Sequence, residues 1–302
     1  MSAEKRFDVT LCGELNLDLI LYGLPEDLPL EREMLCDNLA LTLGSSSAIL
    51  AHNLARLGSR VGFVSRVGGD LLGQIALEWL ASGGVDISRV RRVAHTSGLT
   101  VVLQHQPRRH MLTYPGTMSE MCWEDLDLDY LASARHFHLS SYFLHRALRP
   151  RIAELFRHMK QAGLSTSLDT NDDPTDAWAD DLHAVLRHVD VLLPNEREAQ
   201  RIAGANTLER ALDLLAAEVP LVVVKRGAAG ALARRGAETV TRPAVPATIV
   251  DAVGAGDSFN AGFLHQYLRG ADLGACLEFA NQVAAKSLTR AGGTTAFRET
   301  QS

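Results

Sequence analysis

The chain has 302 residues and a formal net charge of −6, with 22% charged and 46% hydrophobic residues. This length and hydrophobic content fit a globular protein with a sizeable core, and the acidic balance argues against a nucleic-acid or anionic-membrane partner. The four cysteines form no CxxC pair, which argues against a zinc site and a disulfide framework. No apolar run could span a bilayer, and the first residues are polar and charged, so we expect a soluble, cytoplasmic protein.

The chain begins with a predicted buried strand over residues 7–12, followed by the sequence GELNLD. We interpret that sequence as a short loop at the carboxyl end of the strand, where open α/β sheets place ligand groups. Asp18 could then bind sugar hydroxyls. The alternative, to which the local sequence gives equal weight, is that Asn16 and Asp18 only shape a turn.

Helix–strand–helix alternation follows and predicts a parallel sheet. A helix lies between Leu43 and Gly58, which supplies its stop signal. A strand over residues 61–67 precedes a second helix over residues 70–79. The short basic run at residues 89–92 is interpreted as a solvated turn.

Two short strands, residues 99–103 and 110–114, interrupt this alternation. We predict that they form a hairpin inserted into the α/β pattern, the kind of element that makes a lid or a dimer contact. Arg108 and Arg109 near its tip are expected to be solvated, and contact with a phosphate is the alternative.

The second half of the chain resumes the alternation. Its predicted strands cover residues 134–139, 164–168, 189–193, 221–224, 231–234 and 238–241. Its predicted helices cover residues 150–161, 178–187 and 273–289. Because no internal repeat or linker is visible, we expect a single domain over residues 1–302 with a small lid.

Polar residues follow two of these strands, at the edge where such sheets bind ligands. Asp169 and Asn171 follow one strand, and Asn195 and Glu198 follow the next. Asn195 could donate to a phosphate, and Glu198 could orient water on Mg²⁺. The same spacing is a common helix-capping signal, and the local sequence alone favours capping.

Two further features lie towards the carboxyl end of the chain. The residues from Lys225 to Gly230 form a glycine turn after a strongly apolar strand. Asn281 lies on the last long helix and could face an adenine, although an ordinary surface position is the more common outcome for such a residue.

The sequence DAVGAGDSF at residues 251–259 is the most informative segment, because an apolar pattern typical of a helix follows it. The first amides of a helix lack partners and carry partial positive charge, so Gly254, Ala255 and Gly256 predict an anion site. Asp257 would repel a phosphate there unless it has another task. A base for a hydroxyl that attacks phosphorus is such a task, and a plain helix cap is the alternative.

Other phosphate-binding scaffolds do not fit the sequence. No lysine follows a glycine as a Walker A loop requires, and the protein-kinase HRD and DFG elements are absent. The Gly-x-Gly at residues 254–256 lies too near the carboxyl end for a dinucleotide fingerprint and lacks its third glycine. No GxSxG elbow is present. Phosphoryl transfer remains, with the amides at an anion hole, Mg²⁺ on the nucleotide phosphates and Asp257 as base.

These residues resemble the PfkB, or ribokinase-like, carbohydrate kinase family over nearly the whole chain. The resemblance implies an α/β fold with an open, mostly parallel sheet, helices on both faces, and a β-lid formed by residues of about 17–36 and 97–115. It implies Asp257 as the catalytic base and Gly254, Ala255 and Gly256 as the anion hole. The remaining implied positions are Asp18 and Gly44 for the substrate, Asn195, Lys225, Gly227, Gly230 and Asn281 for ATP, Glu198 for Mg²⁺ through water, and Asp251 for a monovalent cation such as K⁺.

The chain departs from the family pattern where its first long helix begins. The family usually has GGxxxN there, whereas this chain has Gly44, Ser45 and then Ile49 in place of the asparagine. An isoleucine cannot replace the hydrogen bonds of an asparagine, so no specific sugar can be transferred from the family. In the carboxyl-terminal motif, Ala252 replaces a threonine.

We therefore predict an ATP-dependent kinase of a small sugar or sugar acid. A nucleoside kinase of the same fold is the alternative within the family, and a non-catalytic sugar- or nucleotide-binding protein is the alternative outside it. Asp257 argues against the binding protein, because pure binding needs no base beside a phosphate. The family resemblance also implies a homodimer through the lid.

Overall fold

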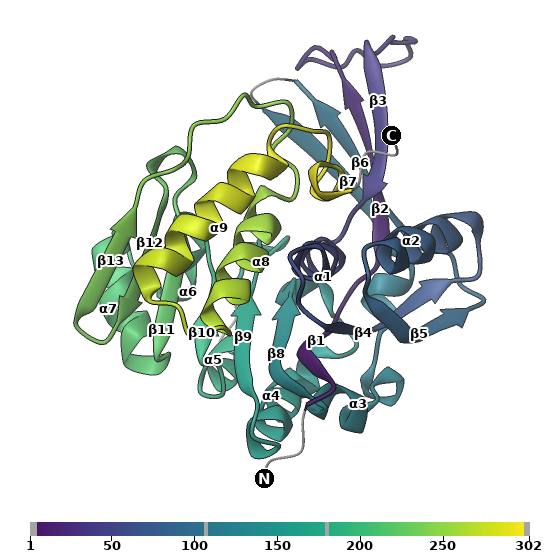
Figure 1. The fold of residues 1–302 in the computed structure, drawn as a ribbon. Helices are drawn as coiled ribbons and strands as arrows, with labels where there is room; N and C mark the ends of the chain where they lie inside the picture. The colour runs from purple at the N-terminus through teal and green to yellow at the C-terminus, as the bar shows by residue number, and fades with distance from the viewer. Residues whose placement is uncertain (1–4, 106–107, 179–180, 299–302) are drawn as a thin grey trace.

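The computed structural model describes residues 5–105, 108–178 and 181–298. Its main sheet has nine strands in the order β13-β12-β11-β10-β9-β8-β1-β4-β5 (Figure 1). The strands are parallel except for β12 and β13. Their bounds are β1 (Phe7–Cys12), β4 (Val61–Gly68), β5 (Asp86–Val93), β8 (Ala134–Ser140), β9 (Ser165–Asp169), β10 (Val191–Leu192), β11 (Leu221–Lys225), β12 (Ala231–Arg235) and β13 (Glu238–Arg242).

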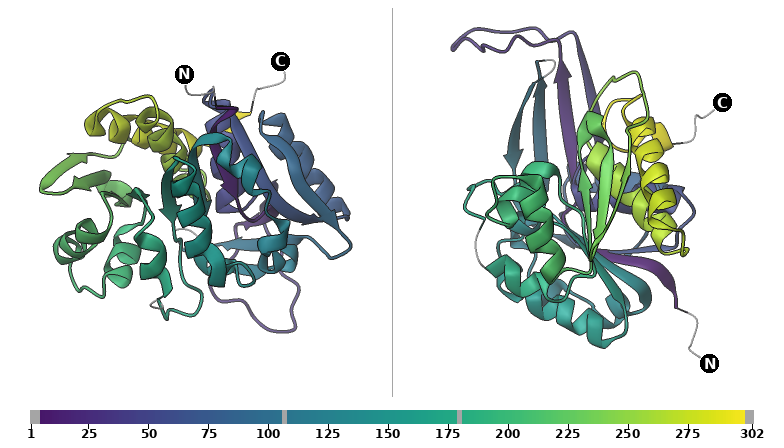
Figure 2. Two further views of the ribbon diagram at one scale, coloured as in Figure 1. Left: turned by 90° about the horizontal axis from the view of Figure 1, so that it is seen from below. Right: turned by 90° about the vertical axis from the view of Figure 1, so that its left-hand side faces the viewer.

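Helices cover both faces of this sheet, which Figure 2 shows nearly edge-on at the right. One layer contains α1 (Ser46–Arg56), α2 (Leu71–Ser82), α8 (Ala255–Tyr267) and α9 (Leu273–Ser287). The other contains α3 (Leu128–Ala132), α4 (Ile152–Gln161), α5 (Asp181–Leu186), α6 (Glu196–Ile202) and α7 (Leu208–Glu218). Successive side chains of a strand point to opposite faces of the sheet, so alternate residues pack against the two helix layers. Val222 and Val224 belong to one apolar core, and Leu221 and Val223 belong to the other.

A second sheet of four strands stands beyond the edge of the main sheet, at the top of Figure 1. Its order is β3-β2-β6-β7, with β2 (Asn16–Tyr22), β3 (Asn38–Leu43), β6 (Gly98–Gln104) and β7 (Arg109–Tyr114). We call this sheet the lid. Strand β2 pairs in parallel with β6, and the outer strands β3 and β7 run antiparallel to them. The strand β3 lies beyond the segment of about 17–36 that was expected to supply lid strands.

The predicted α/β class with a separate lid is confirmed, and most element ends shift by only a few residues. The helix expected at residues 178–187 is described only from Asp181, because residues 179–180 lie outside the described part of the chain. The first turn of the helix expected at residues 150–161 is a 3₁₀ turn. No described helix is long and apolar enough to cross a membrane.

Two local interpretations were wrong. The basic run at residues 89–92 belongs to the edge strand β5 and not to a turn. Its alternate arginines lie on acidic partners, with Arg89 2.6 Å from Asp127 and Arg91 2.5 Å from Asp125. Charged side chains of this kind protect an open sheet edge from pairing with other chains. Asp18 lies within the lid strand β2, not in a loop, because only three residues separate that strand from β1.

Candidate active site

The glycines of the 251–259 segment lie at the start of α8, as predicted. Gly254 is the N-cap and has φ 73°, a conformation that favours glycine. A Cβ on Gly254 would lie 2.5 Å from the Cα of Gly293 and 3.1 Å from Ile49 Cδ1. A Cβ on Gly256 would instead be in ordinary contact with Lys225, 3.8 Å from its Nζ. The first turn of this 13-residue helix therefore opens beside an ammonium group.

Asp257 is buried in that first turn. Burial and, next, the Asp169 carboxylate raise its pKa to about 6, against the opposing effects of Lys225 and of a hydrogen bond with Ser46. A pKa near 6 leaves the carboxylate ionised at neutral pH and close enough to neutrality to accept a proton efficiently. A plain helix cap would need none of these neighbours.

Lys225 ends β11 and contacts Asp169, which ends β9. Asp169 is fully buried and also accepts a hydrogen bond of 2.5 Å from Asn260 Nδ2. Burial by itself would lower the pKa of Lys225, but the Asp169 and Glu198 carboxylates raise it overall. The ammonium therefore stays charged next to the anion site.

Asn195 and Glu198 form the capping box that the local sequence favours. The Asn195 side chain accepts from Glu198 N at 2.9 Å, and Glu198 Oε2 accepts from Asn195 N at 2.7 Å. Glu198 is nevertheless buried, and burial together with the Asp169 carboxylate raises its pKa to about 7. A surface cap would not show this shift, so the box also places a carboxylate in the Lys225 and Asp169 cluster.

The carboxylate of Glu198 suits Mg²⁺, which prefers hard oxygen ligands and usually retains several waters beside nucleotide phosphates. Each Glu198 oxygen accepts one hydrogen bond from Asn195, which leaves lone pairs for a water. Among residues 5–105, 108–178 and 181–298, no group of three or more His, Cys, Asp or Glu side chains could hold a metal ion directly.

The glycine turn after β11 and the residue Asn281 lie at the same end of the main sheet, near β13. Gly227 and Gly230 have φ of 54° and 84° around a short 3₁₀ turn, and a Cβ on Gly230 would clash with the carbonyl of Arg242. Asn281 is buried, not on the surface, and its amide donates to the carbonyl of Pro243 at 2.9 Å. It thus fixes the chain that leaves β13.

Asp18 lies on the lid and faces the same space as Asp257. Burial and then the Asp257 and Asp251 carboxylates raise its pKa to about 7, while Arg109 acts in the opposite direction. A Cβ on Gly44 would clash with the Asp18 carboxylate, so the glycine is needed to admit it. Asn16 Oδ1, on the same strand, is buried without a hydrogen-bond partner in the described structure.

A model of the pfkB family carbohydrate kinases matches residues 7–300 of the chain. The chain belongs to the PfkB family. It is therefore an ATP-dependent kinase of the carbohydrate and nucleoside class.

Individual relatives of this PfkB kinase have different acceptors in their names. It is 28% identical to an ATP-dependent 6-phosphofructokinase of Thermoanaerobacterium thermosaccharolyticum, covering 96% of this chain and 90% of that protein. It is 32% identical to a nucleoside kinase of Methanothermobacter thermautotrophicus, covering 80% and 76% respectively. The structure of a putative ribokinase II from E. coli, in complex with ATP and Mg²⁺, is similar with a TM-score of 0.85 and 25% identity, covering 97% of this chain and 96% of that one.

In this PfkB kinase, Ile49 stands where the family pattern has an asparagine. Ile49 packs against Gly254 and Gly293, directly behind the anion site. Asn53, one helical turn later, donates to Ser258 Oγ and to the carbonyl of Gly293, both at 3.0 Å. Helix α1 therefore contacts the proposed anion site through the apolar side chain of Ile49 and the hydrogen-bonded side-chain amide of Asn53.

A second buried network lies beside Asp257, and nothing in the local sequence indicates it. Glu14 accepts from Ser47 Oγ and Ser141 Oγ, both at 2.8 Å. Burial opposes its ionisation, but the hydrogen bond and charge of His145 lower its pKa to about 2. Ser141 and Asn171 both have positive φ, and strained residues of this kind persist where surrounding contacts fix them, often at active sites.

The Asp251 carboxylate, which the family resemblance implied as a cation ligand, accepts four hydrogen bonds in this structure. Its two oxygens accept hydrogen bonds from Tyr22 Oη at 3.2 Å, Gln104 Nε2 at 3.0 Å, Val253 N at 3.0 Å and Gly292 N at 2.8 Å. The role of Asp251 in binding a monovalent cation stays a prediction, and no step of the reaction is assigned to such an ion.

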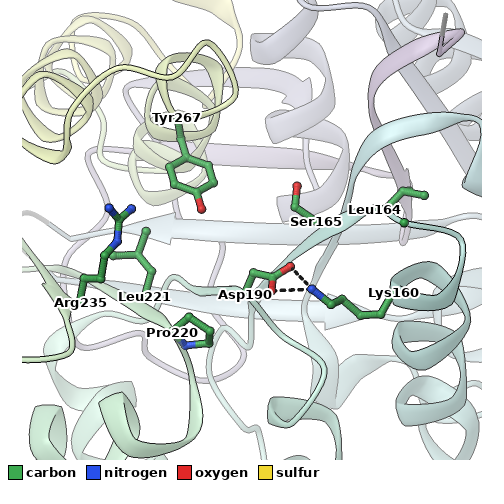
Figure 3. Close-up of a pocket in the computed structure, with 9 residues that line it drawn as sticks. Lys160, Leu164, Ser165, Asp190, Pro220, Leu221, Arg235 and Tyr267 are labelled. Carbon is green, nitrogen blue, oxygen red and sulfur yellow. Dashed lines mark hydrogen bonds and ion pairs between the residues drawn. The ribbon is translucent and has the colours of Figure 1, made fainter. Parts of the chain in front are cut away.

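A cavity of about 450 Å³ lies at the opposite end of the strands (Figure 3). Ser165, which begins β9, lines it, whereas the catalytic-side Asp169 ends the same strand. Its polar wall includes Lys160, paired with Asp190 at 2.6 Å, and the side chains of Arg235 and Tyr267. This cavity is separate from the site around Asp257.

Proposed function

We propose that this PfkB kinase transfers the γ-phosphoryl group of ATP to a hydroxyl of a small sugar or sugar acid, with Asp257 as the base. The observation that carries the proposal is the position of Asp257. Its carboxylate is buried in the first turn of α8, between the glycine amides, Lys225 and Asp18. A base, an anion site and an acceptor-side carboxylate thus meet at one point.

The chain's own groups divide the work as follows. Asp18 accepts hydrogen bonds from the acceptor and holds one hydroxyl towards Asp257. Asp257 takes the proton of that hydroxyl as its oxygen attacks the γ-phosphorus and the bond to ADP breaks. The amides of residues 254–256 and the Lys225 ammonium stabilise the transferring phosphoryl charge, which is the main task of a protein in such a loose transition state.

The donor side would hold ATP between the glycine turn at Gly227 and Gly230 and the chain fixed by Asn281. Asn195 and Glu198 would orient a water on Mg²⁺, which neutralises charge on the nucleotide phosphates when it is bound. This assignment is supported by the ATP and Mg²⁺ complex of the similar ribokinase II structure.

The acceptor class distinguishes this proposal from its alternatives. We would measure ADP formation from ATP and Mg²⁺ with sugars, sugar acids and nucleosides as acceptors. Turnover with nucleosides alone would make this a nucleoside kinase, and no turnover with any acceptor would favour a non-catalytic binding protein.

Asp257→Asn tests the base directly. We expect kcat to fall by about 10²-fold or more, the usual contribution of a positioned general acid or base. In the unmodified enzyme kcat should fall as the pH drops through about 6, because Asp257 must be ionised to accept a proton. Asp272→Asn is the matched control, since Asp272 caps α9 outside the site by accepting from Ala275 N at 2.8 Å. Equal kcat for the Asp257→Asn variant and the unmodified enzyme would refute the assignment.

A further inference from the structure

The carboxylate of Asp251 joins the lid to the loop that carries the anion site. Two of its four donors are side chains of the lid, Tyr22 on β2 and Gln104 on β6. The other two are backbone amides, those of Val253 and Gly292. Asp251 itself is buried, so each of these hydrogen bonds is largely shielded from competing water.

The two lid donors lie on the same face of the lid as the acceptor-side carboxylate. Tyr22 follows Asp18 by four residues on β2, and side chains an even number apart on a strand point to the same face. Thr100 is directly opposite Asp18 in the register, and Gln104 follows Thr100 by four residues on β6. One polar lid face therefore carries both the acceptor contact and the two contacts to Asp251.

The two backbone donors lie on either side of the anion site. The Val253 amide precedes Gly254, the N-cap of α8, so its hydrogen bond to Asp251 fixes the chain that enters the helix. The Gly292 amide precedes Gly293, whose backbone packs against Gly254 and accepts from Asn53. Movement of the Asp251 carboxylate would be transmitted to both walls of the anion site.

We propose that Tyr22 and Gln104 are positioning residues that lock the lid to Asp251 and so hold the anion site in its working geometry while the acceptor is bound. The inference rests on the proposed kinase function and adds a physical link between its two substrates. An acceptor bound at Asp18 stabilises the seated lid, the seated lid fixes Asp251, and Asp251 fixes residues 253 and 254. The phosphoryl-binding amides are then in place when a hydroxyl is present to receive the phosphoryl group.

The kinetic test removes each lid donor with little change in shape. Tyr22→Phe and Gln104→Met should each lower kcat by about 10-fold, in line with the contribution of a hydrogen bond to a charged group. The dissociation constant of ATP should stay the same, because the proposed ATP contacts lie outside the lid. Tyr114→Phe is the matched control, since it makes the same chemical change on the exposed strand β7 of the same lid.

A double-mutant cycle shows whether the effect passes through Asp251. In an Asp251→Asn background, Tyr22→Phe should have little further effect on kcat. Unmodified kcat in both lid variants, or an undiminished loss in the Asp251→Asn background, would overturn the proposal.

A second measurement does not depend on turnover or on knowing the acceptor. Amide hydrogen exchange in the peptide that contains residues 252–256 should become faster in Tyr22→Phe than in the unmodified protein, and should not change in Tyr114→Phe. Exchange that is equal in all three proteins would refute the link between the lid and the anion site. If no acceptor is turned over but exchange increases as expected, the kinase proposal fails and the positioning link survives.

Discussion

The two sheets of this protein differ in how their faces are covered. The nine-stranded sheet has an apolar core on each face, and the proposed active-site groups Asp169 and Lys225 end strands deep inside it. The lid has a polar inner face that carries Asp18, and only the base of its outer face, at Leu17 and Leu43, packs into the core that contains α2. The donor groups are therefore held by packing, whereas the acceptor group is held by a thin sheet and a few side-chain contacts. Substitutions in the main sheet and in the lid should therefore change different kinetic constants.

The largest effect should come from a substitution in the main sheet. Lys225→Met removes the cation beside the anion site and leaves the carboxylates of Asp169, Glu198 and Asp257 without it. We expect kcat to fall by about 10²–10³-fold, as when one group that stabilises transition-state charge is lost. Because Lys225 also lowers the pKa of Asp257, the acidic limb of the kcat profile should move to a pH above about 6.

Lys160→Met is the matched control for that prediction. Lys160 also pairs with an aspartate, Asp190, but it lies at the opposite end of the sheet in the cavity of Figure 3. Its removal should leave kcat and the position of the acidic limb unchanged. An acidic limb that stays at the same pH in Lys225→Met would show that the ammonium does not act on Asp257.

The acceptor side should respond in KM instead of kcat. Asp18→Asn replaces a charged acceptor of hydrogen bonds by a neutral one, and we expect the KM for the acceptor to rise by about 10–100-fold. The KM for ATP should stay unchanged, because the groups proposed to bind ATP lie outside the lid. Steady-state kinetics with each substrate varied in turn would separate the two constants.

The KM for the acceptor should also depend on pH. Burial and the neighbouring carboxylates raise the pKa of Asp18 to about 7. Asp18 therefore gains a proton as the pH falls from 8 to 6, and the KM for the acceptor should rise over that range in the unmodified enzyme. The Asp18→Asn variant should show no such rise, and a rise of equal size in both proteins would contradict the role of Asp18.

The fold and much of the donor side could be predicted from the sequence, because their signals are local. Buried parallel strands are continuous apolar runs, and the glycines around Asp257 and the pair Asn195 and Glu198 each lie within a few residues of one another. Short motifs of this kind carry their own geometry, such as a helix start or a capping box.

The contacts that complete the site could not be predicted, because they join residues far apart in the chain. Asn260 and Lys225 converge on Asp169 from α8 and β11, and nothing in their local sequence indicates that they meet. The position of Asp18 was misread for a related reason. The chain enters the lid almost directly from β1, and the pairing partners that make residues 16–22 a strand lie on β3 and β6.

The outer face of the lid is apolar except for His110 on β7, which pairs with Leu103. The strand register places Leu39, Leu21 and Leu103 in one row and Leu41, Leu19, Val101 and Leu112 in the next, beside Leu99 and Tyr114. A contiguous apolar sheet face of this size marks an interaction surface more often than a solvated one. We propose that a second copy of this chain covers it and forms a homodimer through the lid.

The smallest kinetic effect and the clearest change in mass should come from Leu112→Glu, which places a charge within that face. We expect sedimentation equilibrium to show a monomer for this variant and a dimer for the unmodified protein. The neighbouring Met111 is a stringent control, because it is 60% exposed against 59% for Leu112 but points to the other face of β7. Met111→Glu should remain dimeric, and an equal mass for both variants would exclude the outer face as the interface.

Because Leu112→Glu leaves Tyr22, Gln104 and Asp251 intact, a monomer that keeps its kcat would show that the lid is held in place by those contacts and not by the partner.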